Sequence, residues 1–197
     1  RLNRTGGTGT GGAFNLAVSG ATSREECAIY AWEDNAPGVV VSEINVPGEG
    51  QFIAGSNVVD NLDGTWTYNY AIFNNTSDFS ADSLSIPIPS GATVFDEGFS
   101  FPLYHSGEPY TNLPWTLSTN GSTISWETVN GYNAGNDTAN ALRWGTTYSY
   151  WFTSNTPPVS GLAVLGLFKT GNPGDQVFDV LVPDGTGPGG VIITNYC

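Results

Sequence analysis

The sequence has little positive charge. Of its 197 residues, only five are Lys or Arg, against 18 Asp and Glu, and the formal net charge is −13. Such a surface repels nucleic-acid backbones and anionic lipid, so neither is an expected partner, whereas divalent cations are attracted. Charged residues make up 12% of the chain, about half the usual share. Low charge with abundant Gly, Ser, Thr and Asn is typical of an extracellular all-β domain.

Residues that perform chemistry are also scarce. His105 is the single histidine and only two cysteines occur, which does not favour a zinc site. His105 stands beside Ser106, but no G-x-S-x-G elbow is present, so we interpret it as a loop histidine rather than part of a triad. Methionine is absent, even at position 1, which predicts a processed product. No apolar run approaches the length of a membrane span.

The two cysteines, Cys27 and Cys197, predict one disulfide in an oxidising compartment. The alternative is a bond between subunits, and the sequence leaves both open.

What the sequence does contain is strand pattern. In TWTYNYAIFN, the apolar Trp66, Tyr68, Tyr70 and Ile72 alternate with smaller residues, which predicts a strand with one face in the core. The Asp63-Gly64 turn precedes it. Similar segments, separated by Gly/Pro turns, predict an antiparallel β-sandwich of jelly-roll type. They are GVVVSEI, SLSIPI, STISWET, RWGTTYSYWFTS, GLAVLGLF, QVFDVLV and GGVIITNY.

One segment allows a short helix, near residues 23–32. Ser23 followed by Glu26 fits a capping box, although Ile29, Tyr30 and Trp32 fit a strand equally well.

The N-terminal segment RTGGTGTGG matches G-x-G-x-x-G at Gly7, Gly9 and Gly12. A dinucleotide loop needs a strand before these glycines and a helix after them, and the sequence offers neither. We interpret residues 1–20 as a Gly-rich arm and strand, and residues 21–197 as one sandwich domain. The alternating Phe14, Leu16 and Val18 are the side chains predicted to insert at a sheet edge, and the sequence leaves open whether that edge belongs to a neighbouring subunit or to the same one.

Further ligand sites are predicted from single residues. Trp115, which follows Pro114 in a loop-like stretch, and Trp151, opposite in phase to Tyr150, are the candidate exposed rings for stacking on sugars. Core spacing assigns the interior to Trp66, Tyr68, Tyr148 and Tyr150. Asp60 and Asp63 are weak candidate Ca²⁺ ligands, although turn formation alone explains them. The N-x-[ST] sequons, which permit glycosylation, occur at Asn3, Asn74, Asn75, Asn120 and Asn136.

Three segments carry a resemblance to known proteins: DGTWTYNYAIFNNTSDFSADSLSIPIP, NALRWGTTYSYWFTSNTPP and LGLFKTG. They resemble uncharacterised all-β domains of secreted bacterial proteins, planctomycete-like in character, over roughly residues 60–170. The resemblance implies an extracellular all-β module and carries no catalytic motif.

These observations predict a secreted structural or adhesive β-sandwich without a catalytic constellation. The leading expectation is a subunit of an extracellular filament or surface assembly that contacts copies of itself through its N-terminal strand. The alternative is a carbohydrate-binding module that takes glycans. A glycoside-active jelly-roll enzyme, built on paired carboxylates, is third.

Overall fold

Strand β5 (Trp66–Asn74) shows how the sequence pattern builds the interior. Tyr68, Tyr70 and Ile72 are each at most 2% exposed, whereas the alternating Asn69 and Ala71 are only half-buried. Trp66 is half-buried and packs against the same core. The predicted orientation of this strand is therefore confirmed.

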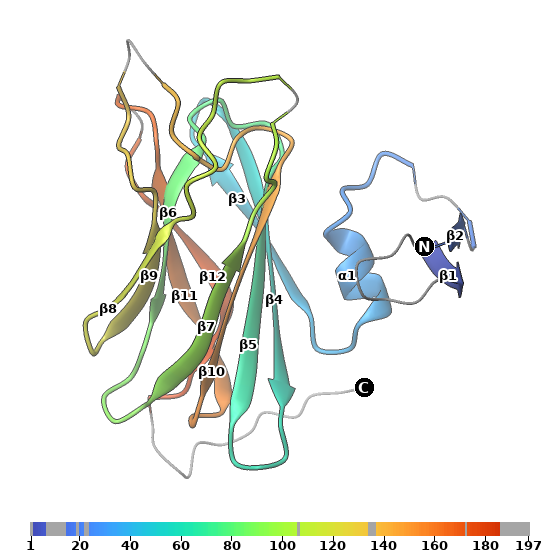
Figure 1. Ribbon diagram of the computed structural model, residues 1–197. Helices are drawn as coiled ribbons and strands as arrows, with labels where there is room; N and C mark the ends of the chain where they lie inside the picture. The colour runs from blue at the N-terminus through green and yellow to red at the C-terminus, as the bar shows by residue number, and fades with distance from the viewer. Residues whose placement is uncertain are drawn as a thin grey trace.

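Two five-stranded sheets, antiparallel throughout, face each other in the computed structural model, as Figure 1 shows. It describes residues 2–6, 15–18, 20–21, 24–105, 107–133, 137–171 and 173–185. The first sheet has the order β3 (Val40–Val46), β4 (Gly50–Asp60), β5, β10 (Thr147–Ser154) and β7 (Val94–Ser100). The second has the order β12 (Gln176–Pro183), β11 (Pro158–Leu167), β6 (Ala81–Pro87), β9 (Thr123–Glu127) and β8 (Thr116–Thr119). The predicted antiparallel β-sandwich is confirmed.

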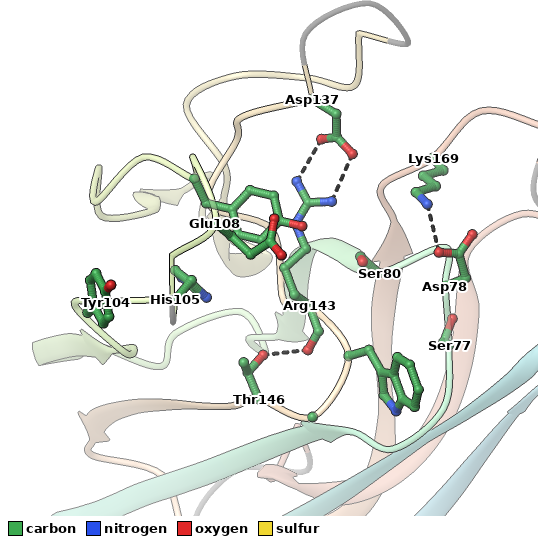
Figure 2. Close-up of a pocket in the computed structure, with 13 residues that line it drawn as sticks. Ser77, Asp78, Ser80, Tyr104, His105, Glu108, Asp137, Arg143, Thr146 and Lys169 are labelled. Atoms are coloured by element: carbon green, nitrogen blue, oxygen red, sulfur yellow. Dashed lines mark hydrogen bonds and ion pairs between the residues drawn. The ribbon is translucent and has the colours of Figure 1, made fainter.

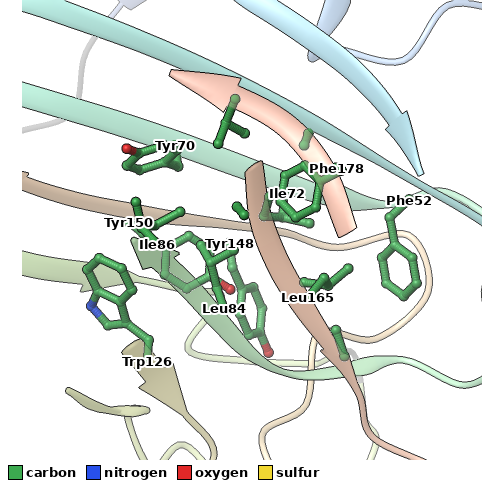
Figure 3. Packing of buried hydrophobic residues seen from close by; sticks show 14 of the residues in the cluster. Phe52, Tyr70, Ile72, Leu84, Ile86, Trp126, Tyr148, Tyr150, Leu165 and Phe178 are labelled. Carbon is green, nitrogen blue, oxygen red and sulfur yellow. The ribbon is translucent and has the colours of Figure 1, made fainter. Parts of the chain in front are cut away.

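Aromatic side chains of the two sheets interleave in the core (Figure 3). Trp126 of β9 meets Tyr150 of β10 edge-on, with ring centroids 5.4 Å apart. Tyr68 and Phe152 stack at 4.9 Å within the first sheet. Each buried side chain of this size contributes roughly 1.5–3 kcal/mol to folding, before the entropy of ordering is subtracted.

One side of the sandwich is closed by polar contacts between the sheets. The Ser42 hydroxyl of β3 donates to the backbone carbonyl of Asp179 in β12 at 2.6 Å. The fully buried hydroxyl of Ser56 in β4 accepts from the Leu181 N–H of β12 at 3.1 Å. The Tyr70 hydroxyl donates to the Leu181 carbonyl. These bonds satisfy the Asp179 carbonyl and the Leu181 N–H and carbonyl of β12, which no strand pairs.

Some elements differ from the sequence-based expectation. Strands β4, β7 and β8 were not predicted, because Gly55, Ser56 and Asn57 interrupt the apolar pattern of β4, and β7 contains Asp96 and Glu97. Helix α1 spans Tyr30–Asn35, with Ile29 at its N-cap and no side-chain cap. It begins seven residues after Ser23, the predicted cap, which lies outside the described residues. The predicted strand GGVIITNY also lies outside them.

The N-terminal strands form a third, separate sheet. β1 (Leu2–Gly6) pairs antiparallel with β2 (Asn15–Val18), in a register that aligns Leu2 with Val18 and Arg4 with Leu16. This ribbon shares no strand with either five-stranded sheet. Figure 1 shows it on the far side of α1 from the sandwich.

Candidate functional site

Strand β8 leaves one edge of the second sheet unpaired. In the hairpin that joins β8 to β9, the Asn120 N–H donates to the Thr123 carbonyl at 3.2 Å. Hydrogen-bonded pairs alternate along an antiparallel ladder, so Ser118 and Thr116 also bond toward β9. The N–H and C=O groups of Leu117 and Thr119 therefore point away from β9. We call these four groups the β8 edge, and within the described part of the chain no backbone partner meets them.

Core side chains next to the β8 edge are incompletely covered. Val94 and Phe99 of β7, Phe101 and Leu117 pack against the core but stay only half-buried. We call these four residues the apolar seam. A hollow of about 130 Å³ lies beside it, lined in part by Val94 and Thr119. The side of the sandwich opposite the β3–β12 closure is therefore apolar and open.

The free edge of β7 is protected in a way that the β8 edge is not. Asp96 has φ of 53°, and the pairing of β7 with β10 shifts register between Trp151 and Thr153. Asp96 and the adjacent Glu97 are both exposed. Irregular backbone and charge are devices that prevent a sheet edge from pairing with another chain. β8 carries no charged residue, so it is the edge that accepts a further strand more readily.

The residues predicted to dock on a neighbour fall in or beside β2. Leu16 and Val18 belong to β2, and Phe14 lies outside the described residues. Gly7, Gly9 and Gly12 also lie outside them. Asn3 belongs to β1. A two-stranded ribbon is marginally stable alone in water.

A second feature is an open groove on the outer face of the first sheet. It has a volume of about 470 Å³, and its side-chain lining comes from Trp32, Asn57, Asn69, Ala71, Ser149 and Trp151, which we call the outer groove. The Trp32 ring of α1 packs over Gly55 of β4, and the Trp151 ring lies over Gly98 of β7. Only glycine fits beneath Trp151, since a Cβ at position 98 would lie 2.0 Å from the indole.

The two tryptophans predicted as exposed rings have different fates. Trp151 faces outward, opposite in phase to Tyr150, and is half-buried in the outer groove. The prediction is wrong for Trp115, which is 4% exposed. Its ring stacks on Phe99 at 5.3 Å and its Nε1 donates to the Asn140 carbonyl at 2.5 Å, so it belongs to the core. Trp32 was not singled out, because nothing local shows that Gly55 receives its ring.

A polar pocket of about 500 Å³ lies at one end of the sandwich (Figure 2). Arg143 donates to both carboxylate oxygens of Asp137, at 2.9 and 2.6 Å. Its guanidinium carbon lies 4.2 Å from the Tyr110 ring centroid and 4.9 Å from that of Phe168. This arrangement joins three loops, and we interpret it as a structural clamp.

The mouth of this pocket carries exposed rings and the single histidine. Trp144 and Tyr104 are 72% and 75% exposed. His105 packs edge-on against Tyr110 at 5.4 Å, and burial lowers the pKa of His105. Its sequence neighbour Ser106 lies outside the described residues.

One of the two cysteines predicted to form a disulfide lies within the described residues. Cys27 is a free thiol in the structure, half-buried, with its Sγ 3.5 Å from the Asn75 Oδ1. Its predicted partner, Cys197, lies outside the described residues.

The sequons differ sharply in accessibility. Asn74 is fully buried, and its Nδ2 donates to the carbonyls of Ser77 and Leu142, so it cannot carry a glycan in the folded chain. Asn75 is half-buried and donates to Gln51. Asn120 is exposed at the β8–β9 turn. Asn136 lies outside the described residues.

The candidate calcium ligands serve the β4–β5 turn. The Asp60 carboxylate accepts from the Leu62 N–H at 2.8 Å, and the Asp63 carboxylate accepts from the N–H and hydroxyl of Thr65. These bonds lower the pKa of Asp63, the Thr65 hydroxyl being the main cause. Among the residues that the structure describes, no three His, Cys, Asp or Glu side chains gather in a metal-binding group.

Comparison with known proteins returns no matching family model, no matching curated protein and no matching solved structure. In the described ranges, no helix has the length and apolar character needed to span a bilayer.

Proposed function

We propose that this protein is the subunit of an extracellular homomeric assembly, in which the N-terminal strand of one copy pairs with the β8 edge of the next. The observation that carries the proposal is the unprotected β8 edge, with the half-buried apolar seam beside it. The separate N-terminal ribbon supports it, because that ribbon pairs with neither sheet of its own sandwich.

The lengths and chemistry of the two strands agree. β2 and β8 have four residues each, and with Phe14, which directly precedes β2, the donor segment is one residue longer than β8. Main-chain bonds to the Leu117 and Thr119 groups provide register. Alternate side chains of the incoming strand would lie over the apolar seam, and the sequence supplies Phe14, Leu16 and Val18 at that spacing.

The energy of such a contact comes from apolar burial. Ordering the five residues from Phe14 to Val18 costs about 5–10 kcal/mol of backbone entropy, which hydrogen bonds of about 1 kcal/mol each offset only in part. Three buried side chains of the size of Phe, Leu and Val contribute about 5–9 kcal/mol. Pairing is therefore favourable only when the seam receives these side chains, which gives the contact its specificity.

The contact joins two different surfaces, one on each copy. Such head-to-tail contacts repeat to give an open filament, or a ring where the rotation closes. The composition supports an extracellular setting, since low charge and high Ser, Thr, Asn and Gly are common in exported β domains.

The test compares assembly of the full chain with two perturbations of the same contact. Deletion of residues 1–20 removes the donor strand, and Thr119→Pro removes one outward N–H from the acceptor without touching the bonds to β9. Light scattering and electron microscopy should show concentration-dependent assembly of the full chain and folded monomers after deletion. Thr119→Pro should weaken association at least tenfold.

Thr119→Val is the matched control, because it keeps the backbone N–H at an exposed position and should assemble like the parent. A full chain that stays monomeric at high concentration refutes the proposal. So does a deletion that unfolds the domain, since the strand would then belong to its own sandwich.

A further inference from the structure

The outer groove lies on the opposite sheet from the β8 edge and serves no step of the assembly described above. It combines two features that favour one ligand class. Trp32 and Trp151 stand on either side of a floor made of small and amide side chains. A volume of about 470 Å³ falls in the range of ligand sites.

The strand positions set the distance between the two glycines that lie beneath the rings. Gly55 beneath Trp32 lies on β4, and Gly98 beneath Trp151 lies on β7, three strand positions away across β5 and β10. At about 4.8 Å per strand, and with Gly98 two residues along β7 from Ser100, the partner of Ser149, the two glycines lie roughly 16 Å apart. The intervening Ala71 and Ser149 are directly paired and small, so the floor between the rings stays low.

The polar groups of the floor have acceptor capacity to spare. Asn57 and Asn69 are directly paired across β4 and β5. Asn57 uses its Nδ2 on the Pro37 carbonyl at 3.2 Å, and Asn69 uses its Nδ2 on the Thr67 carbonyl at 3.4 Å. Neither Oδ1 oxygen has a hydrogen-bond partner in the part of the chain that the structure describes. Both are half-buried and border the outer groove.

The groove carries no ionisable side chain in its lining apart from the inward-facing Tyr70 and Tyr150 of its floor strands. A charged ligand would find no counter-charge there, and an anionic one would be repelled by the net charge of −13. Aromatic faces suit the C–H faces of a pyranose ring, and amide oxygens accept from its hydroxyls. We propose that the outer groove binds an uncharged polysaccharide, with Trp151, Trp32 and the Asn57–Asn69 pair as its contacts.

The test titrates the full chain with soluble uncharged hexasaccharides of glucose, xylose and mannose, and with polygalacturonate, by calorimetry. At least one uncharged glycan should bind, and polygalacturonate should not. Trp151→Ala should weaken that binding at least tenfold, and Asn69→Leu severalfold. Trp144→Ala is the matched control, since this tryptophan is 72% exposed at the polar pocket outside the groove, and it should bind like the parent.

Each other outcome has a definite reading. No binding of any uncharged glycan overturns the proposal, as does tighter binding of polygalacturonate. Equal losses in Trp151→Ala and Trp144→Ala place the sugar elsewhere and also overturn it. If Trp151→Ala lowers the melting temperature, glycan binding by Asn69→Leu, measured in a variant with the stability of the parent, decides the test. Thr119→Pro should leave glycan binding unchanged, which separates this proposal from the assembly.

Discussion

Removing one half of the Arg143–Asp137 clamp should cost more stability than removing any exposed ion pair of this chain. Asp137→Ala leaves the guanidinium, whose side chain is 10% exposed, with the Ala139 carbonyl as its one remaining hydrogen-bond acceptor among the described residues. Breaking a buried pair in this way costs about 3–5 kcal/mol. Because the Asp137 side chain is 26% exposed, part of that loss is recovered by water, and we expect about 2–4 kcal/mol.

The assay is equilibrium urea unfolding followed by tryptophan fluorescence, with a calorimetric melt. A loss of this size lowers the melting temperature by roughly 5–12 °C for a domain of this length. Asp78→Ala is the matched control in the same pocket, because Asp78 pairs with Lys169 but its side chain is 85% exposed. Such a surface pair is worth about 0–1 kcal/mol.

A double-mutant cycle isolates the pair itself. In an Arg143→Met background the buried charge is gone, so Asp137→Ala should then cost less than about 1 kcal/mol. The reasoning fails if Asp137→Ala costs no more than Asp78→Ala, or if its cost is the same with and without Arg143. Either result would mean that water already solvates the guanidinium.

Three further predictions follow from burial and hydrogen bonding. Burial raises the pKa of Asp82, and the nearby Glu127 raises it further. The folded chain therefore holds the Asp82 proton more tightly than the unfolded chain, and folding stability should fall as pH rises above 3.8. Asp82→Asn should raise the melting temperature at neutral pH but not below pH 3.8. The hydrogen bond to Glu43 raises the pKa of Tyr30 to about 12, so its contribution to stability is complete below pH 10 and is lost as pH rises toward 12, and Tyr30→Phe should flatten that loss in alkaline melts. In a eukaryotic secretory host, peptide mapping should find glycan on Asn120 and none on Asn74; modified Asn74 in folded protein would contradict its burial.

The strands that the sequence predicts are those in which apolar inward residues alternate regularly with outward residues. In β5 and β10, large inward residues alternate with mostly smaller outward ones, Phe73 and Trp151 excepted, and the inward rings are among the largest fully buried side chains of the described residues. β4 fails this test, because its inward Ser56 serves a hydrogen bond to β12 and its outward Gly55 makes room for Trp32. Ser56 and Gly55 are required by contacts with segments that are distant in sequence. The local sequence pattern of β4 therefore does not reveal them.

The same reasoning explains the outcome for the candidate site residues. Pro114 makes the approach to β8 look like a loop, but the buried position of the Trp115 ring depends on Phe99 and on the Asn140 carbonyl. The outward orientation of Trp151 was predicted correctly, because it follows from the alternation of residues within the single strand β10. The exposed rings Trp144 and Tyr104 were not singled out, since both lie in irregular segments where spacing carries no information.

The two proposed contacts lie on different sheets, and this has a consequence for how the protein would work. At the β3–β12 side, the Asp179 carbonyl and the Leu181 N–H of β12 are already bonded to Ser42 and Ser56, whereas the backbone groups of the β8 edge have no such partner among the described residues. The outer groove, on the other sheet, is then not used by the contact between copies.

In a linear assembly the outer groove would repeat once per subunit, and weak sites that repeat along one object bind a polymer more tightly than any single site does. Glycan affinity measured on assembled protein should therefore exceed that of the monomeric deletion variant for long polysaccharides, yet equal it for a single hexasaccharide. Equal affinities for both ligands would show that the grooves do not act together, and would disconnect sugar binding from assembly.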